Sequence, residues 1–165
     1  MKTVQEEDLI FDVSTAVNAE RFDDKKLHGS RSTMKKVDFI IEENERIIFL
    51  EVKDPDIPGA SNVEEFKRSL KDDSLIYELS GKFRDSLLFA RQRGEIEKPI
   101  DYIVLISMEA LDKGLLPNMI DRLSRSIPIS HKSWVGDLVN SSVILKLDSF
   151  KERFGGESVW RASDF

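Results

Sequence analysis

Two apolar segments joined by a short polar turn constrain the fold of this 165-residue chain more than any other feature. Val37–Ile41 is followed by the polar residues 42–45 and then by Arg46–Lys53. Both segments are rich in β-branched and aromatic residues, which predicts two antiparallel strands in a hairpin. Asp54 and Pro55 come next and end the second strand, because proline cannot donate a hydrogen bond to a sheet.

This hairpin brings three charged side chains to one place. If Asn44 and Glu45 form its tip, Asp38 lies directly opposite Glu51. The Cβ atoms of such facing residues are about 4.5–5.5 Å apart. Lys53 shares the face of Glu51, because side chains along a strand alternate with a period of two. The sequence therefore predicts that Asp38, Glu51 and Lys53 converge on one patch.

The two acids need a positive charge between them. Asp38 and Glu51 on facing strands repel each other, and burial increases the cost. Two sources of positive charge are open: a cross-strand salt bridge from Lys53 on a solvated strand face, or a divalent metal ion. The chain has no cysteine and only His28 and His131. A metal here would therefore have oxygen ligands, which suit Mg²⁺ or Mn²⁺ better than zinc.

The spacing of these residues resembles a known motif. The chain has Val37-Asp38, then twelve further residues, then Glu51-Val52-Lys53. This motif resembles that of the PD-(D/E)XK nuclease superfamily, which has the restriction-endonuclease-like fold. The resemblance is greatest to small members such as Holliday junction resolvases. The resemblance implies Mg²⁺-dependent (or Mn²⁺-dependent) hydrolysis of phosphodiester bonds in DNA. Asp38 and Glu51 would be metal ligands, joined by the main-chain carbonyl of Val52, and Lys53 the catalytic lysine. Val37 stands where the family often has proline.

The resemblance also implies a further acid from the first helix and basic residues near the substrate. Candidates for the acid are Glu6, Glu7, Asp12 and Glu20. We favour Glu20 as a metal ligand, because it shares a face with Val17 in a predicted helix. The basic residues expected to contact nucleic acid are Lys35, Lys36, Lys82 and Arg84. For each of them the alternative is a solvated position on the surface.

The remaining patterns predict an α/β (α+β) protein with helices packed on a mixed sheet, which is also the restriction-endonuclease-like architecture. Apolar spacing predicts a helix over residues 8–24, a loop over 25–36 and one or two helices over 63–93. The buried face of the longer helix would contain Ile76, Leu79, Phe83, Leu87 and Ala90. Beyond it we expect a buried strand at 100–106, a helix from about Pro117 to Ser126, a strand at 142–147 and a last helix that Asp148 caps. No repeat or linker divides the chain, so residues 1–165 are expected to form a single domain.

Composition narrows the function classes. The net charge of −6 argues against a protein that coats nucleic acid through bulk charge, but not against an enzyme that touches it locally. The apolar runs are too short to span a bilayer, and the first residues lack the apolar core of a signal peptide. We therefore expect a cytoplasmic protein with no membrane contact and with nucleic acid, first of all DNA, as its partner. A homodimer is a further expectation, because one nuclease site cuts one strand.

Two alternatives stay open. The chain can be a catalytically silent, nuclease-like binding or assembly module in a defence or mobile-element system, with a contact surface around Trp134 or Trp160. The acidic net charge, the uncertain further acid and the lack of a substrate-recognition domain favour this alternative. An RNA-directed nuclease is the other alternative, and the sequence does not separate it from a DNA-directed one.

Overall fold

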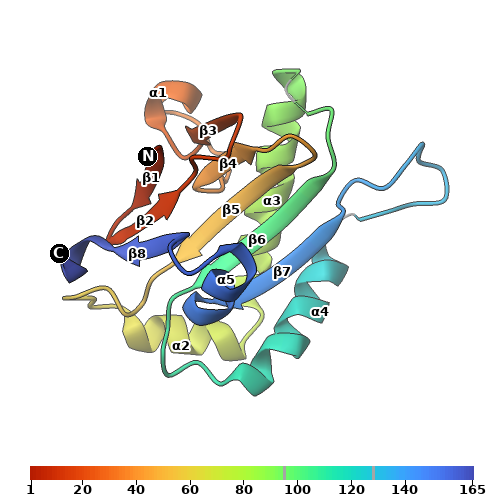
Figure 1. Ribbon diagram of the computed structural model, residues 1–165. Helices are drawn as coiled ribbons and strands as arrows, with labels where there is room; N and C mark the ends of the chain where they lie inside the picture. The colour runs from red at the N-terminus through yellow and green to blue at the C-terminus, as the bar shows by residue number, and fades with distance from the viewer. Residues whose placement is uncertain (95, 128) are drawn as a thin grey trace.

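The structure is a computed structural model that describes residues 1–94, 96–127 and 129–165. Two sheets organise these ranges (Figure 1). The larger sheet has the strand order β3 (Asn18–Arg21), β4 (Phe39–Glu42), β5 (Ile47–Lys53), β6 (Ile100–Ile106) and β7 (Ser141–Lys146). The smaller sheet has the order β1 (Thr3–Glu6), β2 (Leu9–Asp12) and β8 (Val159–Arg161). The mixed α/β class is as predicted.

The predicted hairpin is confirmed, with its register. Strands β4 and β5 pair antiparallel, and Ile40 lies opposite Phe49. Extending this register by two residues places Asp38, just before β4, opposite Glu51. The count from the turn was therefore right, because a short polar turn leaves little freedom in how the two strands align.

Strands β5 and β6 run parallel at the centre of the larger sheet. Every residue of β6 is buried, and so is every residue of β5 except Lys53. This confirms the prediction of a strand covered on both faces. Parallel neighbours need crossover connections, which α2 (Val63–Lys71) and α3 (Ser74–Gln92) provide between β5 and β6, and α4 (Leu116–Ser126) between β6 and β7.

Two hydrophobic cores lie on the two faces of the larger sheet. One face packs against α3 and α4, where the rings of Phe49 and Phe83 have centroids 5.7 Å apart. The residues predicted for the buried face of α3, Ile76, Leu79, Phe83, Leu87 and Ala90, are all in this core. The other face packs against the smaller sheet and α5 (Leu147–Phe154), with Leu50 in the same cluster as Phe11 and Phe150. The larger sheet is thus the middle layer of the structure (Figure 1).

The predicted helix over residues 8–24 is wrong, because this segment forms β2 and β3. Leu9, Phe11 and Val13 are buried in the second core, with more exposed residues between them. That alternation has the period of a strand. Pairing of β2 with β8, about 150 residues later, overrides the local helical spacing.

Two smaller expectations also change. The predicted loop over residues 25–36 contains the short helix α1 (Lys25–His28), and Asp24 caps it by accepting a hydrogen bond from the amide of Lys26 (2.8 Å). Asp148 lies in the first turn of α5 and is not its cap, because β7 runs directly into the helix at Leu147. An acid in a first turn still favours the helix through its dipole. Short 3₁₀ helices cover Lys113–Leu115 and Ala162–Asp164.

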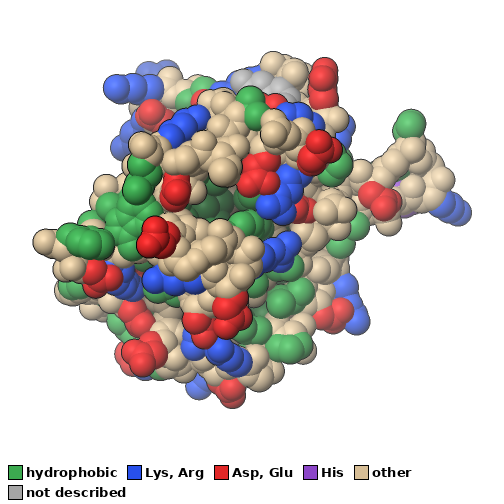
Figure 2. Space-filling model, in the orientation of Figure 1, with side chains coloured by type: hydrophobic (Ala, Val, Ile, Leu, Met, Phe, Trp, Pro, Cys, Tyr) green, Lys and Arg blue, Asp and Glu red, His purple; other side chains and the backbone are tan. Residues whose placement is uncertain are grey.

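The surface carries charges of both signs. Figure 2 shows acidic and basic side chains interspersed over this face, with no continuous basic region on it. The loop between α4 and β7 projects from the body of the molecule (Figure 1) and exposes Trp134 and Val135. Trp160, in contrast, is partly buried on β8 and pairs with Ile10 of β2. None of the helices in the described ranges has the length and apolar character that a membrane span requires.

Candidate functional site

Asp38 is held in place by α3 and by β5. The segment before it is tied to α3, since the amides of Lys35 and Val37 donate to Asp85 Oδ2 (2.8 Å) and Ser86 Oγ (2.9 Å). Asp38 itself is 4% exposed, and its Oδ2 accepts a hydrogen bond from the amide of Val52 (2.7 Å). Burial raises the pKa of Asp38, although the charge of Lys82 and the Val52 amide oppose the rise.

Glu51 lies in the middle of the sheet with 0% exposure. Its Oε1 accepts a hydrogen bond from Lys82 Nζ (2.5 Å) and forms an ion pair with Lys53 Nζ (3.3 Å). Its Oε2 is buried and has no hydrogen-bond partner in the part of the chain that the structure describes. Burial, and then the charge of Asp38, raise the pKa of Glu51 to about 7, despite the two lysines. One oxygen of a fully buried carboxylate is thus left for a ligand.

Lys53 bridges two acids. Its Nζ donates to Glu78 Oε1 on α3 (2.8 Å) and lies 3.3 Å from Glu51 Oε1. Burial alone would lower the pKa of Lys53, but the two carboxylates outweigh it and the net shift is upward. Burial would likewise raise the pKa of Glu78, and the hydrogen bond from Lys53 turns the net shift downward. Lys53 is therefore a charged ammonium group fixed beside Glu51.

Glu6 is one of two N-terminal acids that reach this region, the other being Glu7. Glu6 lies at the end of β1, with its Oε2 2.6 Å from Arg21 Nη2. Burial and the charge of Asp38 raise its pKa to about 7, and Arg21 opposes the rise. Glu6 was one of four acids considered from the sequence, and its position depends on a strand, β1, that the sequence did not predict.

The acids and lysines line one cleft of about 630 Å³. One wall is the loop of residues 54–62, which follows β5 and contains Pro55 and Pro58. The charged residues that line the cleft are Glu6, Glu7, Asp23, Asp38, Glu51, Lys53, Asp54 and Lys82. Acids therefore outnumber bases, which favours cationic ligands in the cleft.

Arg161 fixes the start of the loop that walls the cleft. Its guanidinium donates to both carboxylate oxygens of Asp54, at 2.9 and 2.8 Å. It also donates to Ser107 Oγ (2.8 Å) and to Asp8 Oδ2 (3.1 Å). A residue of β8 thereby links the end of β5 to the smaller sheet, and bidentate pairing makes that link geometrically specific.

Of the remaining residues predicted for the site, Val52 and Lys82 line the cleft, and so does Glu7, one of the four candidate acids. Glu20 does not line the cleft, and its carboxylate forms an ion pair with Arg93 (2.7 Å). The reason is that Glu20 lies on strand β3, where it is opposite Ile40 and not opposite Asp38. Arg84 donates to the carbonyl of Ser126 in α4 (3.0 Å). Lys35 is exposed with its Nζ 4.9 Å from the ring centroid of Tyr77, and Lys36 is half-buried outside the cleft lining.

Sequence reasoning missed Glu78 as the partner of Lys53. The signal that was present is its spacing, because Glu78 and Lys82 are four residues apart on a helix and so face the same side. What the spacing does not reveal is how α3 is rotated over the sheet. That rotation is set by the buried face of the helix, including Leu79 and Phe83.

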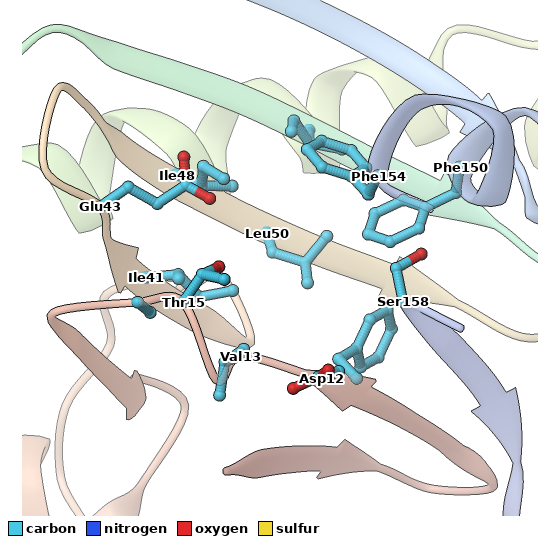
Figure 3. Close-up of a pocket in the computed structure, with 13 residues that line it drawn as sticks. Asp12, Val13, Thr15, Ile41, Glu43, Ile48, Leu50, Phe150, Phe154 and Ser158 are labelled. Atoms are coloured by element: carbon cyan, nitrogen blue, oxygen red, sulfur yellow. The ribbon is translucent and has the colours of Figure 1, made fainter. Parts of the chain in front are cut away.

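A second, smaller cavity lies on the opposite face of β5. Figure 3 shows its lining, which is mostly apolar and includes Leu50, Phe150 and Phe154, with Asp12 and Glu43 at its edge. Its volume is about 120 Å³. It lacks the convergent charged groups of the cleft, so we place the candidate site in the cleft.

The donor set suits a magnesium-type ion held by few protein ligands. No group of three or more histidine, cysteine, aspartate or glutamate residues suited to a metal occurs in the described ranges. Asp38 and Glu51 supply two facing carboxylates, and the free Oε2 of Glu51 is an unused oxygen ligand. Mg²⁺ is commonly bound by one or two carboxylates, with water and substrate phosphate as its other ligands. The residues present therefore fit such an ion.

Comparison of the chain with protein-family models, with curated proteins and with solved structures found no match. Fold and site accordingly define the class: a mixed α/β protein with a buried carboxylate pair and two lysines in an acidic cleft.

Proposed function

We propose that this protein is a Mg²⁺-dependent or Mn²⁺-dependent nuclease of the PD-(D/E)XK type, with a restriction-endonuclease-like core, that hydrolyses phosphodiester bonds in DNA. The observation that carries the proposal is the buried pair of Asp38 and Glu51. One Glu51 oxygen has no partner among the described residues, and the Lys53 ammonium group lies 3.3 Å from the other oxygen. A strand face that only served solubility would not bury a carboxylate completely.

Each residue has a role in this chemistry. Asp38 and Glu51 would hold the metal ion, with the main-chain carbonyl of Val52 as a further protein oxygen. When bound, the ion supplies Lewis-acid catalysis to phosphodiester hydrolysis. Lys53 would orient the attacking water and offset the negative charge that develops on the phosphate. Glu78 fixes the position of Lys53 through its 2.8 Å hydrogen bond.

The experiment has a binding arm and a turnover arm. Thermal unfolding is measured with and without millimolar Mn²⁺ or Mg²⁺ on the wild type and on Glu51→Ala. An ion at ~100 times its dissociation constant adds about 2.7 kcal/mol, which raises the melting temperature by several degrees. We expect that shift in the wild type and not in Glu51→Ala. Absence of a shift in the wild type would count against the metal site.

Turnover is tested on linear, branched and single-stranded DNA, with RNA of the same sequences beside them. Lys53→Ala should fold and lose cleavage by a factor of about 10²–10³, as removal of a preorganised charge-stabilising group does. Lys98→Ala is the matched control, because Lys98 also pairs with a glutamate, Glu42 at 2.6 Å, away from the cleft. Cleavage that survives in Lys53→Ala would remove this mechanism. Light scattering in the same samples tests whether the protein forms the homodimer that the sequence led us to expect.

A non-catalytic binding or assembly module is the second candidate. It is favoured by one observation: Glu51 already has two lysines at its Oε1, so the site is neutralised without a metal. This candidate predicts neither metal-induced stabilisation nor cleavage, together with binding through an exposed surface such as the loop that carries Trp134.

A further inference from the structure

Of the two lysines that line the cleft, Lys82 has no part in the proposed catalytic roles. It lies on α3, one helical turn after Glu78. Its side chain is 17% exposed, and its Nζ is 2.5 Å from Glu51 Oε1. Within the described ranges, Glu51 is the only acid with which Lys82 forms an ion pair. Lys53, by contrast, lies closer to Glu78 (2.8 Å) than to Glu51 (3.3 Å).

The Lys82 ammonium group acts on both acids of the facing pair. It contacts Glu51 directly, and its charge is the largest influence that opposes the burial-driven rise in the pKa of Asp38. Two buried carboxylates on facing strands need such a cation, because leaving either of them ionised and unpaired is costly. Lys82 therefore stands in for the positive charge that a divalent ion would bring.

A divalent ion and this ammonium group compete for the same carboxylate. Both are cations, and an ammonium group 2.5 Å from Glu51 Oε1 repels a second cation bound at that carboxylate. The four-carbon stem of lysine can carry its charge away to another anion. A phosphate group of a nucleic acid entering the cleft is an anion of the required kind.

We propose that Lys82 is a built-in counter-ion that neutralises Glu51 in the metal-free protein and lowers the affinity of the site for divalent cations until a phosphate draws the lysine away. This inference rests on the proposed function and adds regulation to the same site. Metal and nucleic acid then bind cooperatively, because the contact between Lys82 and Glu51 opposes the binding of both, and either ligand breaks it.

The test is titration of the whole chain with Mn²⁺ at pH 8 by calorimetry, for wild type, Lys82→Met and Lys82→Arg. Lys82→Met should bind Mn²⁺ at least about tenfold more tightly, because the ion no longer displaces a buried cation. Lys82→Arg keeps the charge and should bind as the wild type does. Lys98→Met is the control for loss of a lysine elsewhere. Should Lys82→Met fail to fold, Lys82→Gln replaces it.

The outcomes separate this inference from the proposed function. If the wild type binds Mn²⁺ and the neutral variants bind it with equal or weaker affinity, the counter-ion role is overturned. The metal site itself is then still supported. Absence of Mn²⁺ binding in both the wild type and Lys82→Met would overturn the metal site and the counter-ion role together. A second readout is a short phosphorothioate DNA added during the titration, which should tighten Mn²⁺ binding in the wild type and much less in Lys82→Met.

Discussion

At the scale of single residues, burial decides the chemistry of the site. Glu51 is an ordinary carboxylate placed where no solvent reaches it, with one oxygen held by lysines and the other without a protein partner in the described ranges. Asp38 differs, because one of its oxygens is used to accept the Val52 amide. One carboxylate of the pair thus has an oxygen held by the main chain, and the other has an oxygen without a protein partner in the described ranges.

Asp38 offers a matched pair of substitutions. Asp38→Asn keeps an oxygen that accepts the Val52 amide and removes the repulsion with Glu51, so the metal-free protein should be at least as stable as the wild type. Asp38→Ala leaves that buried amide unsatisfied and should lose about 1–3 kcal/mol. Both variants should lose the Mn²⁺-induced rise in melting temperature. Urea unfolding measures the difference, and equal destabilisation of the two variants would argue against the structural role given to Asp38.

At the scale of elements, α3 builds most of the site from one side. Asp85 and Ser86 tie down the segment that ends at Asp38, while Glu78 and Lys82 pair with the lysine and the glutamate of β5. Both pairs of residues belong to a helix whose buried face is anchored in the first core. A shift of α3 therefore moves Asp38 together with Glu78 and Lys82.

Helix α1 gives a pH-dependent prediction. The His28 ring contacts Phe22 and Phe89, with centroids 4.7 and 4.2 Å away, and its Nε2 is 2.8 Å from the carbonyl of Phe22. Burial lowers the pKa of His28, with help from the charges of Lys36 and Arg93, while the Phe22 carbonyl and Asp23 oppose the shift. The folded state thus binds this proton less well than the unfolded state. Its contribution to stability is complete above pH ~6.5 and is lost as the pH falls through the folded-state pKa.

The measurement compares melting temperatures between about pH 7.5 and 5.5 for the wild type and His28→Gln. The wild type should lose more stability relative to the variant as the pH falls. Glu6 and Glu51 have pKa values raised to about 7, so their protonation increases the stability of the folded state as the pH falls. This contribution is the same in the wild type and in His28→Gln and cancels in the comparison. His131→Gln, in an exposed loop, should follow the wild type. Parallel curves for the wild type and His28→Gln would contradict the prediction.

The elements that could be read from the sequence are those with strong local patterns. The β4–β5 hairpin has a short turn and apolar strands, and α3 has a long apolar face, so both were predicted, with their facing residues. Residues 8–24 could not be read correctly, since Leu9, Val13 and Val17 fit a helix as well as a strand. Strands β1 and β8 have little apolar signal and form through pairing between distant parts of the chain.

The same limit applied to the site. Asp38, Glu51 and Lys53 were placed together by counting residues along one hairpin. Glu6 and the two α3 residues, Glu78 and Lys82, come from elements whose positions depend on tertiary packing. Local spacing contains no information on which strand edge or helix face meets the hairpin, so their contacts could not be derived.

At the scale of the whole molecule, Arg161 joins the two sheets. Asp54 has a side chain that is 1% exposed and depends on this guanidinium for its charge pairing. Arg161→Ala should therefore cost about 3 kcal/mol in the free energy of unfolding, the usual penalty for leaving a buried charge without its partner. Arg125→Ala is the control, because its pair with Asp121 is exposed and its loss should cost less than about 1 kcal/mol. A small effect of Arg161→Ala in urea unfolding would contradict this role.

The pairing of β2 with β8 has a consequence for the order in which the protein is made. Residues 9–11 find their partners only at 159–161, so the smaller sheet cannot close while the ribosome is still synthesising the segment between them. Glu6 lies on that sheet, and Arg161 holds the loop beside the acids. A nascent chain whose hairpin has already folded would thus carry an unfinished cleft, which is completed only after the β8 segment has left the ribosome.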